Sequence, residues 1–338
     1  MAGFFVAVLL LYAVPGALAQ SASALAGLAW SELFGFLLPA ALAAAGANLR
    51  PARLLGLDRP PPVVTLLLAL FCGVAGFLVA GSVMALTTLV LPARWVEAFD
   101  LSPLFAGPPW HRLLLATLAS LLAPLCEEAA FRGYVQRSLA QRLRPAGAIG
   151  LAALLFAVMH LDPVRFPALV ILGCLFGWLS WRAGSIWAGV AAHVANNGIA
   201  SLAAAASGGA GPEAPASALQ ALGLLAGGAA WLAVLAWLYV RATPSPPPAS
   251  DAVLPVDPAL PTGRFRFARV PLPLRRLVVL GMLLLGLIGL GGALRGARPT
   301  PGDGRRRASS TAPRGTAARP GGPAAGGAPP PAGDRPAP

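Results

Sequence analysis

Long runs of apolar residues, separated by short polar links, dominate the first 240 positions of this chain. A helix needs about 20 mainly apolar residues to cross the hydrocarbon core of a bilayer. On that criterion we predict eight or nine helices, at residues 3–19, 28–46, 63–91, 112–126, 146–161, 166–182, 186–206, 216–240 and 275–294. The fourth continues as a more polar helix to about residue 143. The pattern therefore predicts an all-α fold, a polytopic transmembrane helical bundle.

The same pattern divides the chain into segments. Residues 1–20 are predicted to be a first transmembrane helix or a signal peptide, and the missing basic n-region favours an uncleaved helix. The further predicted segments are transmembrane helices in 21–107, a central helical part, a transmembrane helix in 207–241, a Pro-rich linker at 242–274 and a transmembrane segment at 275–295. The C-terminal tail, 296–338, is mostly Pro, Gly, Ala and Arg and is predicted to be disordered.

Composition supports the membrane interpretation. Hydrophobic residues make up 57% of the chain and charged residues 11%, whereas soluble domains carry about 25% charged residues. The three cysteines, Cys72, Cys126 and Cys174, all fall inside apolar segments, and their spacing matches neither a disulfide framework nor a metal site. They are predicted to be small buried hydrophobic residues.

The basic residues orient the predicted helices. The formal charge of +13 comes from arginine alone, and no basic segment interleaved with aromatic residues is present, so we predict no nucleic-acid partner. Three alternate links, near Arg50, Arg137 and Arg182, carry the arginines, while the intervening links carry acids such as Glu97 and Asp162. Short cytoplasmic loops are rich in Arg and Lys. The arginine-rich links are therefore predicted to be cytoplasmic, with the side of the C-terminal tail left open. The absence of lysine beside so much Ala, Gly, Pro and Arg is typical of GC-rich codon usage, so we predict a bacterial inner membrane.

A small set of polar side chains interrupts the apolar helices. An ionisable group at the bilayer centre costs roughly 2.5–3.5 kcal/mol on insertion scales, so such residues are functional candidates by default. They are Glu32, Glu127, Glu128, Arg132, His160 and His193, with Asn196 and Asn197 beside the last. Taken singly, a histidine or an asparagine in such a helix is more commonly a structural hydrogen-bonding residue. Together, three helices with polar groups predict one hydrated cavity.

Helical spacing sorts the two glutamates. Residues four apart share a helix face, whereas neighbours are about 100° apart. Glu128 and Arg132 are therefore predicted to pair, which leaves Glu127 free for chemistry. By the same rule Phe156 and His160 share one face.

The polar residue types match those of a hydrolase. A carboxylate beside a histidine can deprotonate a water, either directly or with a metal that lowers the pKa of the water. A histidine and an asparagine amide can donate hydrogen bonds to a developing oxyanion. No Gly-rich phosphate loop, HExxH or GxSxG motif competes with this site. The set therefore indicates an amide hydrolase without a serine or cysteine nucleophile.

Three motifs in order carry a family resemblance. Glu127-Glu128-xxx-Arg132, Phe156-xxx-His160 and His193-xxx-Asn197 resemble the EExxxR, FxxxH and HxxxN/D motifs of the CPBP family, intramembrane proteases that include type II CAAX prenyl endopeptidases and bacterial Abi-type proteins. The resemblance covers about residues 108–206, the predicted protease core.

The resemblance also assigns roles to the motif residues. It implies that Glu127 and His160 activate the water and that His193 and Asn197 form the oxyanion site. Glu128 and Arg132 would support that site. Whether a metal takes part stays open; if Zn²⁺ or another divalent ion binds, Glu127, His160 and His193 would be its ligands.

The predicted partners follow from this reading. They are the lipid bilayer and a peptide or membrane-protein substrate. The sequence defines neither the identity and cleavage site of this substrate nor the oligomeric state of the protein. One alternative is a non-catalytic membrane scaffold or immunity protein with the same fold. A second is a transporter, but the polar pattern is not repeated in the two halves of the chain, as inverted-repeat carriers would require.

Overall fold

The computed structural model describes residues 2–11, 15–46, 57–58, 60–210 and 217–243. Within these ranges every regular element is a helix and no strand occurs. The predicted all-α class is confirmed. The predictions for the helix at 275–294 and for the tail at 296–338 lie outside the described residues, as does nearly all of the Pro-rich linker.

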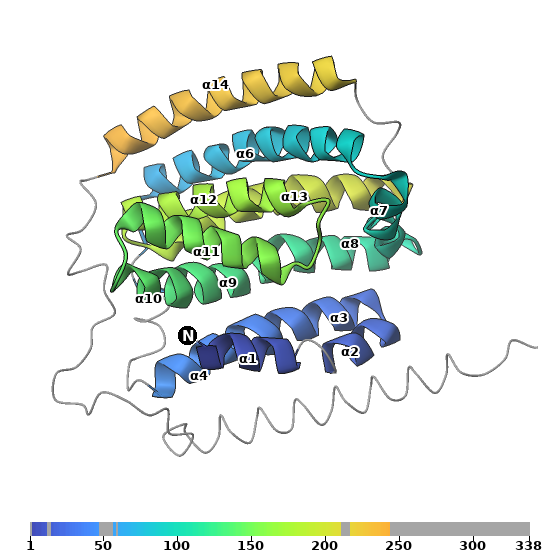
Figure 1. The fold of residues 1–338 in the computed structure, drawn as a ribbon, viewed down its shortest axis with the longest axis horizontal. Helices are drawn as coiled ribbons and strands as arrows, with labels where there is room; N and C mark the ends of the chain where they lie inside the picture. The colour runs from blue at the N-terminus through green and yellow to red at the C-terminus, as the bar shows by residue number, and fades with distance from the viewer. Residues whose placement is uncertain (1, 12–14, 47–56, 59, 211–216, 244–338) are drawn as a thin grey trace, which may run out of the picture. The chain divides into compact units, whose positions relative to one another are not determined.

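The described residues form a series of helices (Figure 1). The N-terminal elements are α1 (Ala2–Leu11), α2 (Ala17–Ala22), α3 (Ala24–Trp30), the π-helical stretch η2 (Ser31–Leu37) and α4 (Leu38–Gly46). Next come α6 (Val63–Val90), α7 (Ala93–Ala98) and the short 3₁₀ helix η3 (Ser102–Phe105). A run of helix then passes through α8 (Pro109–Thr117), η4 (Leu118–Leu122), α9 (Ala123–Glu128), η5 (Ala129–Gln136) and α10 (Arg137–Ala140). The last four are α11 (Pro145–Met159), α12 (Phe166–Ala183), α13 (Ile186–Ser207) and α14 (Ala218–Ala242).

Several of these helices are long and apolar enough to cross a bilayer. By length and composition, five segments qualify among the described residues: Ala24–Ala43, Val63–Val90, Pro109–Ala140, Phe166–Ala183 and Ala218–Ala242. The apolar α11 is shorter, at 15 residues. The chain is therefore an integral membrane protein, as its composition predicted.

Contacts between helix ends bring arginine-rich links to one end of the helices. Arg182, in the last turn of α12, donates from Nε to Thr243 Oγ1 at 3.0 Å and from Nη2 to the carbonyl oxygen of Val240 at 3.1 Å, both beside the end of α14. Trp187, at the start of α13, donates from Nε1 to the carbonyl oxygen of Leu57 at 3.0 Å. The link with Arg182 thus lies at the same end as the residues that precede α6. Which side of the membrane this end faces stays a prediction.

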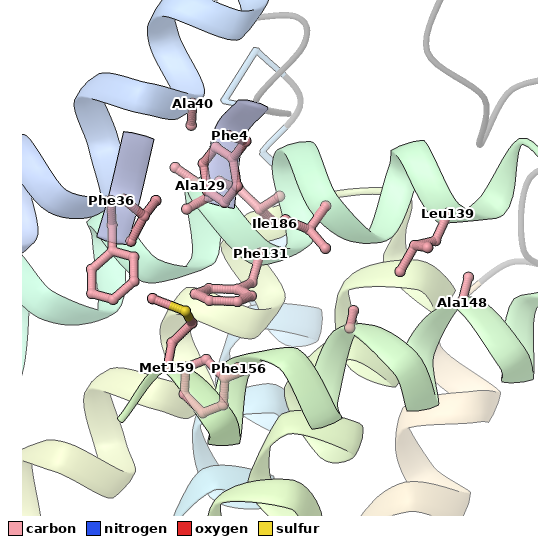
Figure 2. Close-up of a cluster of buried hydrophobic side chains, with 14 of the residues drawn as sticks. Phe4, Phe36, Ala40, Ala129, Phe131, Leu139, Ala148, Phe156, Met159 and Ile186 are labelled. Atoms are coloured by element: carbon pink, nitrogen blue, oxygen red, sulfur yellow. The ribbon is translucent and has the colours of Figure 1, made fainter. Parts of the chain in front are cut away.

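A cluster of buried hydrophobic side chains joins the N-terminal helices to the central ones (Figure 2). Phe131 of η5 is fully buried; its ring centroid is 5.8 Å from that of Phe36 in η2 and 5.2 Å from that of Phe156 in α11. Removing a buried phenylalanine side chain typically costs about 3–5 kcal/mol. This contact therefore holds η2 against the helix that carries the glutamate pair.

Glycines set how closely α6 approaches its neighbours. A Cβ on Gly73 would collide with the backbone of Ala192 in α13, and a Cβ on Gly76 would lie 2.7 Å from the side chain of Leu175 in α12. Small residues at such contacts let membrane helices pack backbone to backbone. The close approach of α6 covers α13 beside His193 and keeps that histidine 3% exposed.

Candidate active site

The two adjacent glutamates end α9, and both approach His193, each at a different ring nitrogen. Glu128 is fully buried, and its Oε1 accepts a hydrogen bond from Arg132 Nη1 at 2.6 Å. The same oxygen lies 3.0 Å from His193 Nδ1. Because a carboxylate only accepts, the imidazole donates in this bond. The predicted pair is present, and His193 is a further partner that helical spacing could not indicate.

Glu127 faces both histidines. Its Oε1 lies 3.8 Å from His160 Nε2, and its Oε2 lies 3.6 Å from His193 Nε2. Both separations exceed a direct hydrogen bond, and a polar contact at such a distance is commonly bridged by water. Glu127 is 6% exposed, so this carboxyl group sits in a largely apolar interior beside two imidazoles.

Hydrogen bonds on the far sides of the two rings set which nitrogen faces Glu127. His160 Nδ1 lies 2.8 Å from the carbonyl oxygen of Phe156, one turn earlier in α11, and must donate because a carbonyl oxygen only accepts. In the neutral imidazole, Nε2 is then a hydrogen-bond acceptor. His193 is held in the same way by Glu128. Both rings thus present an acceptor toward Glu127 unless they carry a second proton.

Aromatic rings fix the planes of the two imidazoles. Phe176 of α12 stacks on His193 with centroids 4.6 Å apart and an interplanar angle of 22°. Phe156 meets His160 edge-on at 4.7 Å and His193 at 6.0 Å. The guanidinium of Arg132 also lies over Phe156, 4.7 Å from its centroid. Nothing in the sequence distinguishes Phe176 from the other apolar residues of α12.

Asn197 lies one turn after His193 on α13 and contacts a different helix. Its Nδ2 donates to the carbonyl oxygen of Ala119 in η4 at 3.1 Å, and its Oδ1 accepts from Asn196 Nδ2 at 3.0 Å. An amide carries two N–H donors, so the bond to Ala119 occupies one of them. The structure brings Glu127, His160 and His193 together and places Asn197 beside them along α13. Its oxyanion role stays a prediction.

A ladder of side chain to backbone bonds holds η5 against α12. Arg132 Nη2 donates to the carbonyl oxygen of Gly173, and Gln136 Nε2 donates to that of Gly177, both at 3.0 Å. Donors and acceptors are each four residues apart, so the two helices run in the same direction at this contact. The matching RxxxQ and GxxxG spacings are visible in the sequence, yet neither predicted this ladder.

Gly189 makes room for Glu128. A Cβ at this position of α13 would lie 2.5 Å from Glu128 Oε2 and would also collide with Ser180 Oγ of α12. Both oxygens are buried and have no hydrogen-bond partner among the described residues. Any larger residue would push α13, and with it His193, away from the glutamate pair. Neither Ser180 nor Gly189 was predicted as a site residue.

A metal was the open alternative for the three residues around Glu127. Two imidazole nitrogens and a carboxylate oxygen are chemically the ligands that Zn²⁺ prefers. In the part of the chain that the structure describes, however, no group of three or more His, Cys, Asp or Glu side chains is arranged to hold a metal ion.

Comparison with known proteins identifies the segment that carries this site. Residues 109–199 match the family model described as type II CAAX prenyl endopeptidase Rce1-like. No curated protein and no solved structure matches the chain. The matched stretch includes Glu127, Glu128, His160 and His193, whose contacts are described above. By this match, the segment that holds the candidate site belongs to the Rce1-like family of type II CAAX prenyl endopeptidases.

Proposed function

We propose that this protein is an intramembrane endopeptidase that hydrolyses peptide bonds of membrane-associated substrates with a water activated by Glu127 and His160. The observation that carries the proposal is the arrangement of the Glu127 carboxyl group between the Nε2 atoms of the half-buried His160 and the buried His193, 3.8 and 3.6 Å away. The match of residues 109–199 to a family of endopeptidases supports the same reaction class.

The water would lie between Glu127 and His160. With His160 Nδ1 donating to Phe156, the ring offers an Nε2 lone pair to one hydrogen of the water, and the carboxylate offers an oxygen to the other. Glu127 removes a proton as the water attacks the peptide carbonyl carbon and later passes it to the leaving amine. Positioned proton transfer of this kind contributes typically 10²–10⁴-fold in rate.

The oxyanion that forms on the carbonyl oxygen needs hydrogen-bond donors. Asn197 can offer an amide N–H, and His193 can donate from Nε2 only as an imidazolium, because its Nδ1 hydrogen is directed to Glu128. Each such donor is worth roughly 2.7–4 kcal/mol to a transition state of this kind. Glu128 and Arg132 then act indirectly, by fixing the position of the His193 ring.

The test is a cleavage assay on purified protein in detergent, with a peptide library and membrane-protein substrates. We expect Glu127→Gln and His160→Ala each to lower kcat/KM at least 100-fold, whereas the matched control Glu97→Gln, at an exposed carboxyl, should leave it unchanged. Wild-type rates in both site variants would contradict the assignment of the water-activating pair. Absence of cleavage by every form would favour the non-catalytic scaffold.

Chelator treatment in the same assay separates two roles for Glu127. As a base acting without a metal, it should support full activity after chelation and dialysis. Activity that is lost on chelation and restored by Zn²⁺ would instead make Glu127 a ligand and would contradict the metal-free mechanism.

A further inference from the structure

The candidate active site is most accessible at His160. The side chain of His160 is 21% exposed, whereas those of Glu127 and His193 are 7% and 4% exposed. A substrate that reaches Glu127 therefore approaches past His160. Exposed side chains next to His160 are the first part of the site that such a substrate meets.

Leu161 follows His160 and holds a backbone conformation that leucine rarely adopts. Its φ is 52°, and in the described part of the chain every other residue with a positive φ is a glycine. The left-handed region costs an L-residue free energy, because Cβ crowds the following carbonyl oxygen. The side chain is 59% exposed, so packing inside the protein does not account for a leucine here. Strain of this kind persists where the surrounding structure imposes it, and such positions cluster at functional sites.

Hydrogen bonds on both sides hold Leu161 in this conformation. Before it, the His160 ring is bonded to the carbonyl oxygen of Phe156 at 2.8 Å. After it, Asp162 is 4% exposed, and its Oδ1 accepts from two backbone N–H groups of the following turn at 2.9 and 3.0 Å. Its Oδ2 accepts from Arg165 Nε at 2.6 Å. The backbone that carries the Leu161 side chain is therefore fixed beside His160.

Contact with lipid is the simpler explanation for an exposed leucine in a membrane protein. Leu151, Leu154 and Val158 are exposed on α11 at intervals of three and four residues, so they share one face that is expected toward lipid. The helix ends at Met159, and a left-handed residue after it does not continue the helical period. A contact with fluid lipid requires no strained backbone, which separates Leu161 from the other three.

We propose that Leu161 is a specificity-determining residue of the peptidase site, whose side chain packs on the substrate side chain next to the scissile bond and limits its size. A side chain on a backbone that is already fixed loses less entropy when it makes such a contact. One methylene more or less at an apolar contact typically changes kcat/KM by roughly 10–200-fold. The assignment rests on the proposed function and names a residue that selects among substrates.

The test uses peptides that differ only in the side chain on either side of the bond that the wild type cleaves, from alanine through leucine to phenylalanine. Leu161→Ala should lower kcat/KM for the leucine peptide at least about 10-fold and shift the preference toward phenylalanine. Leu161→Trp should shift the preference toward alanine. Leu154→Ala, the same change on the exposed face of α11, is the matched control and should keep both the rate and the preference.

Leu161→Gly separates the contact with substrate from the fold of the link. Glycine adopts a positive φ without strain, so this variant should melt no lower than Leu161→Ala and should lose the same contact. Activity that falls in Leu161→Ala and returns in Leu161→Gly would make the effect one of the backbone and would overturn the assignment.

Two other results distinguish this assignment from the reaction itself. Cleavage whose size preference is unchanged in folded Leu161→Ala and Leu161→Trp, or changes equally in Leu154→Ala, would overturn the role of Leu161 and leave the proposed function standing. Absence of cleavage by the wild type would overturn the proposed function and the role of Leu161 with it.

Discussion

Replacing Glu128 tests the division of labour between the two glutamates. In Glu128→Gln the charge of Arg132 stays buried, at 2% exposure, without its partner at 2.6 Å. Removing one member of a buried ion pair typically destabilises by about 3–5 kcal/mol. Native proteins have only about 5–15 kcal/mol of stability, so the loss is a large share of the total. At about 2–4 °C per kcal/mol for a chain of this size class, the melting temperature should fall by about 6–20 °C.

The assay measures melting temperature and folded yield in detergent beside kcat/KM on the same preparations. Glu97→Gln, the same change at an exposed carboxyl, is the control and should shift stability by no more than about 0.5 kcal/mol. A Glu128→Gln protein that melts with the wild type but cleaves nothing would refute the reasoning, because Glu128 would then act in the chemistry itself.

A double variant separates the ion pair from the orientation of His193. Apolar residues of similar volume can replace a buried ion pair at little or no cost, so Glu128→Met with Arg132→Met should be at least as stable as Glu128→Gln alone. It should still be inactive, because His193 Nδ1 has lost its partner at 3.0 Å. Recovery of activity in this variant would show that His193 needs no such partner.

Three further outcomes are expected. Gly189→Ala should lower both the melting temperature and kcat/KM, because the added Cβ would meet Glu128 Oε2. The control Gly198→Ala lies in the same helix, where a Cβ meets nothing within 4 Å, and should change neither quantity by much. Equal effects of the two substitutions would contradict this explanation. Leu161, exposed and with φ of 52°, follows His160, and Leu161→Gly should be about 1 kcal/mol more stable than Leu161→Ala in denaturation, because glycine adopts a positive φ without strain. A cysteine replacing Glu97 should react with a membrane-impermeant reagent in intact cells, whereas one replacing Arg142 should react only after permeabilisation; the reverse pattern would invert the predicted topology.

Features that depend on neighbours within one helix were predictable from the sequence. The pairing of Glu128 with Arg132 follows from four-residue spacing, as does the contact between the His160 ring and Phe156 one turn before it. The membrane class and the positions of the helices follow from long apolar runs, since a bilayer leaves a spanning segment little choice but to be helical.

Contacts between helices were not predictable in this way, because they depend on packing direction and register. Three such contacts join residues of different helices. They are the bond from His193 to Glu128, the ring of Phe176 on His193, and the close approach of Gly189 to Glu128. The packing of η2 on α9 and η5 likewise places Phe36 beside Phe131.

The sequence by itself thus determined that this is a helical membrane protein and which polar side chains interrupt its helices, because hydropathy and helical period are local properties. Only the tertiary structure decided that Glu127 lies between two imidazole Nε2 atoms while Glu128 holds both Arg132 and His193. The physical reason is that a buried carboxyl group takes its role from the donors and charges around it, and here most of these come from other helices.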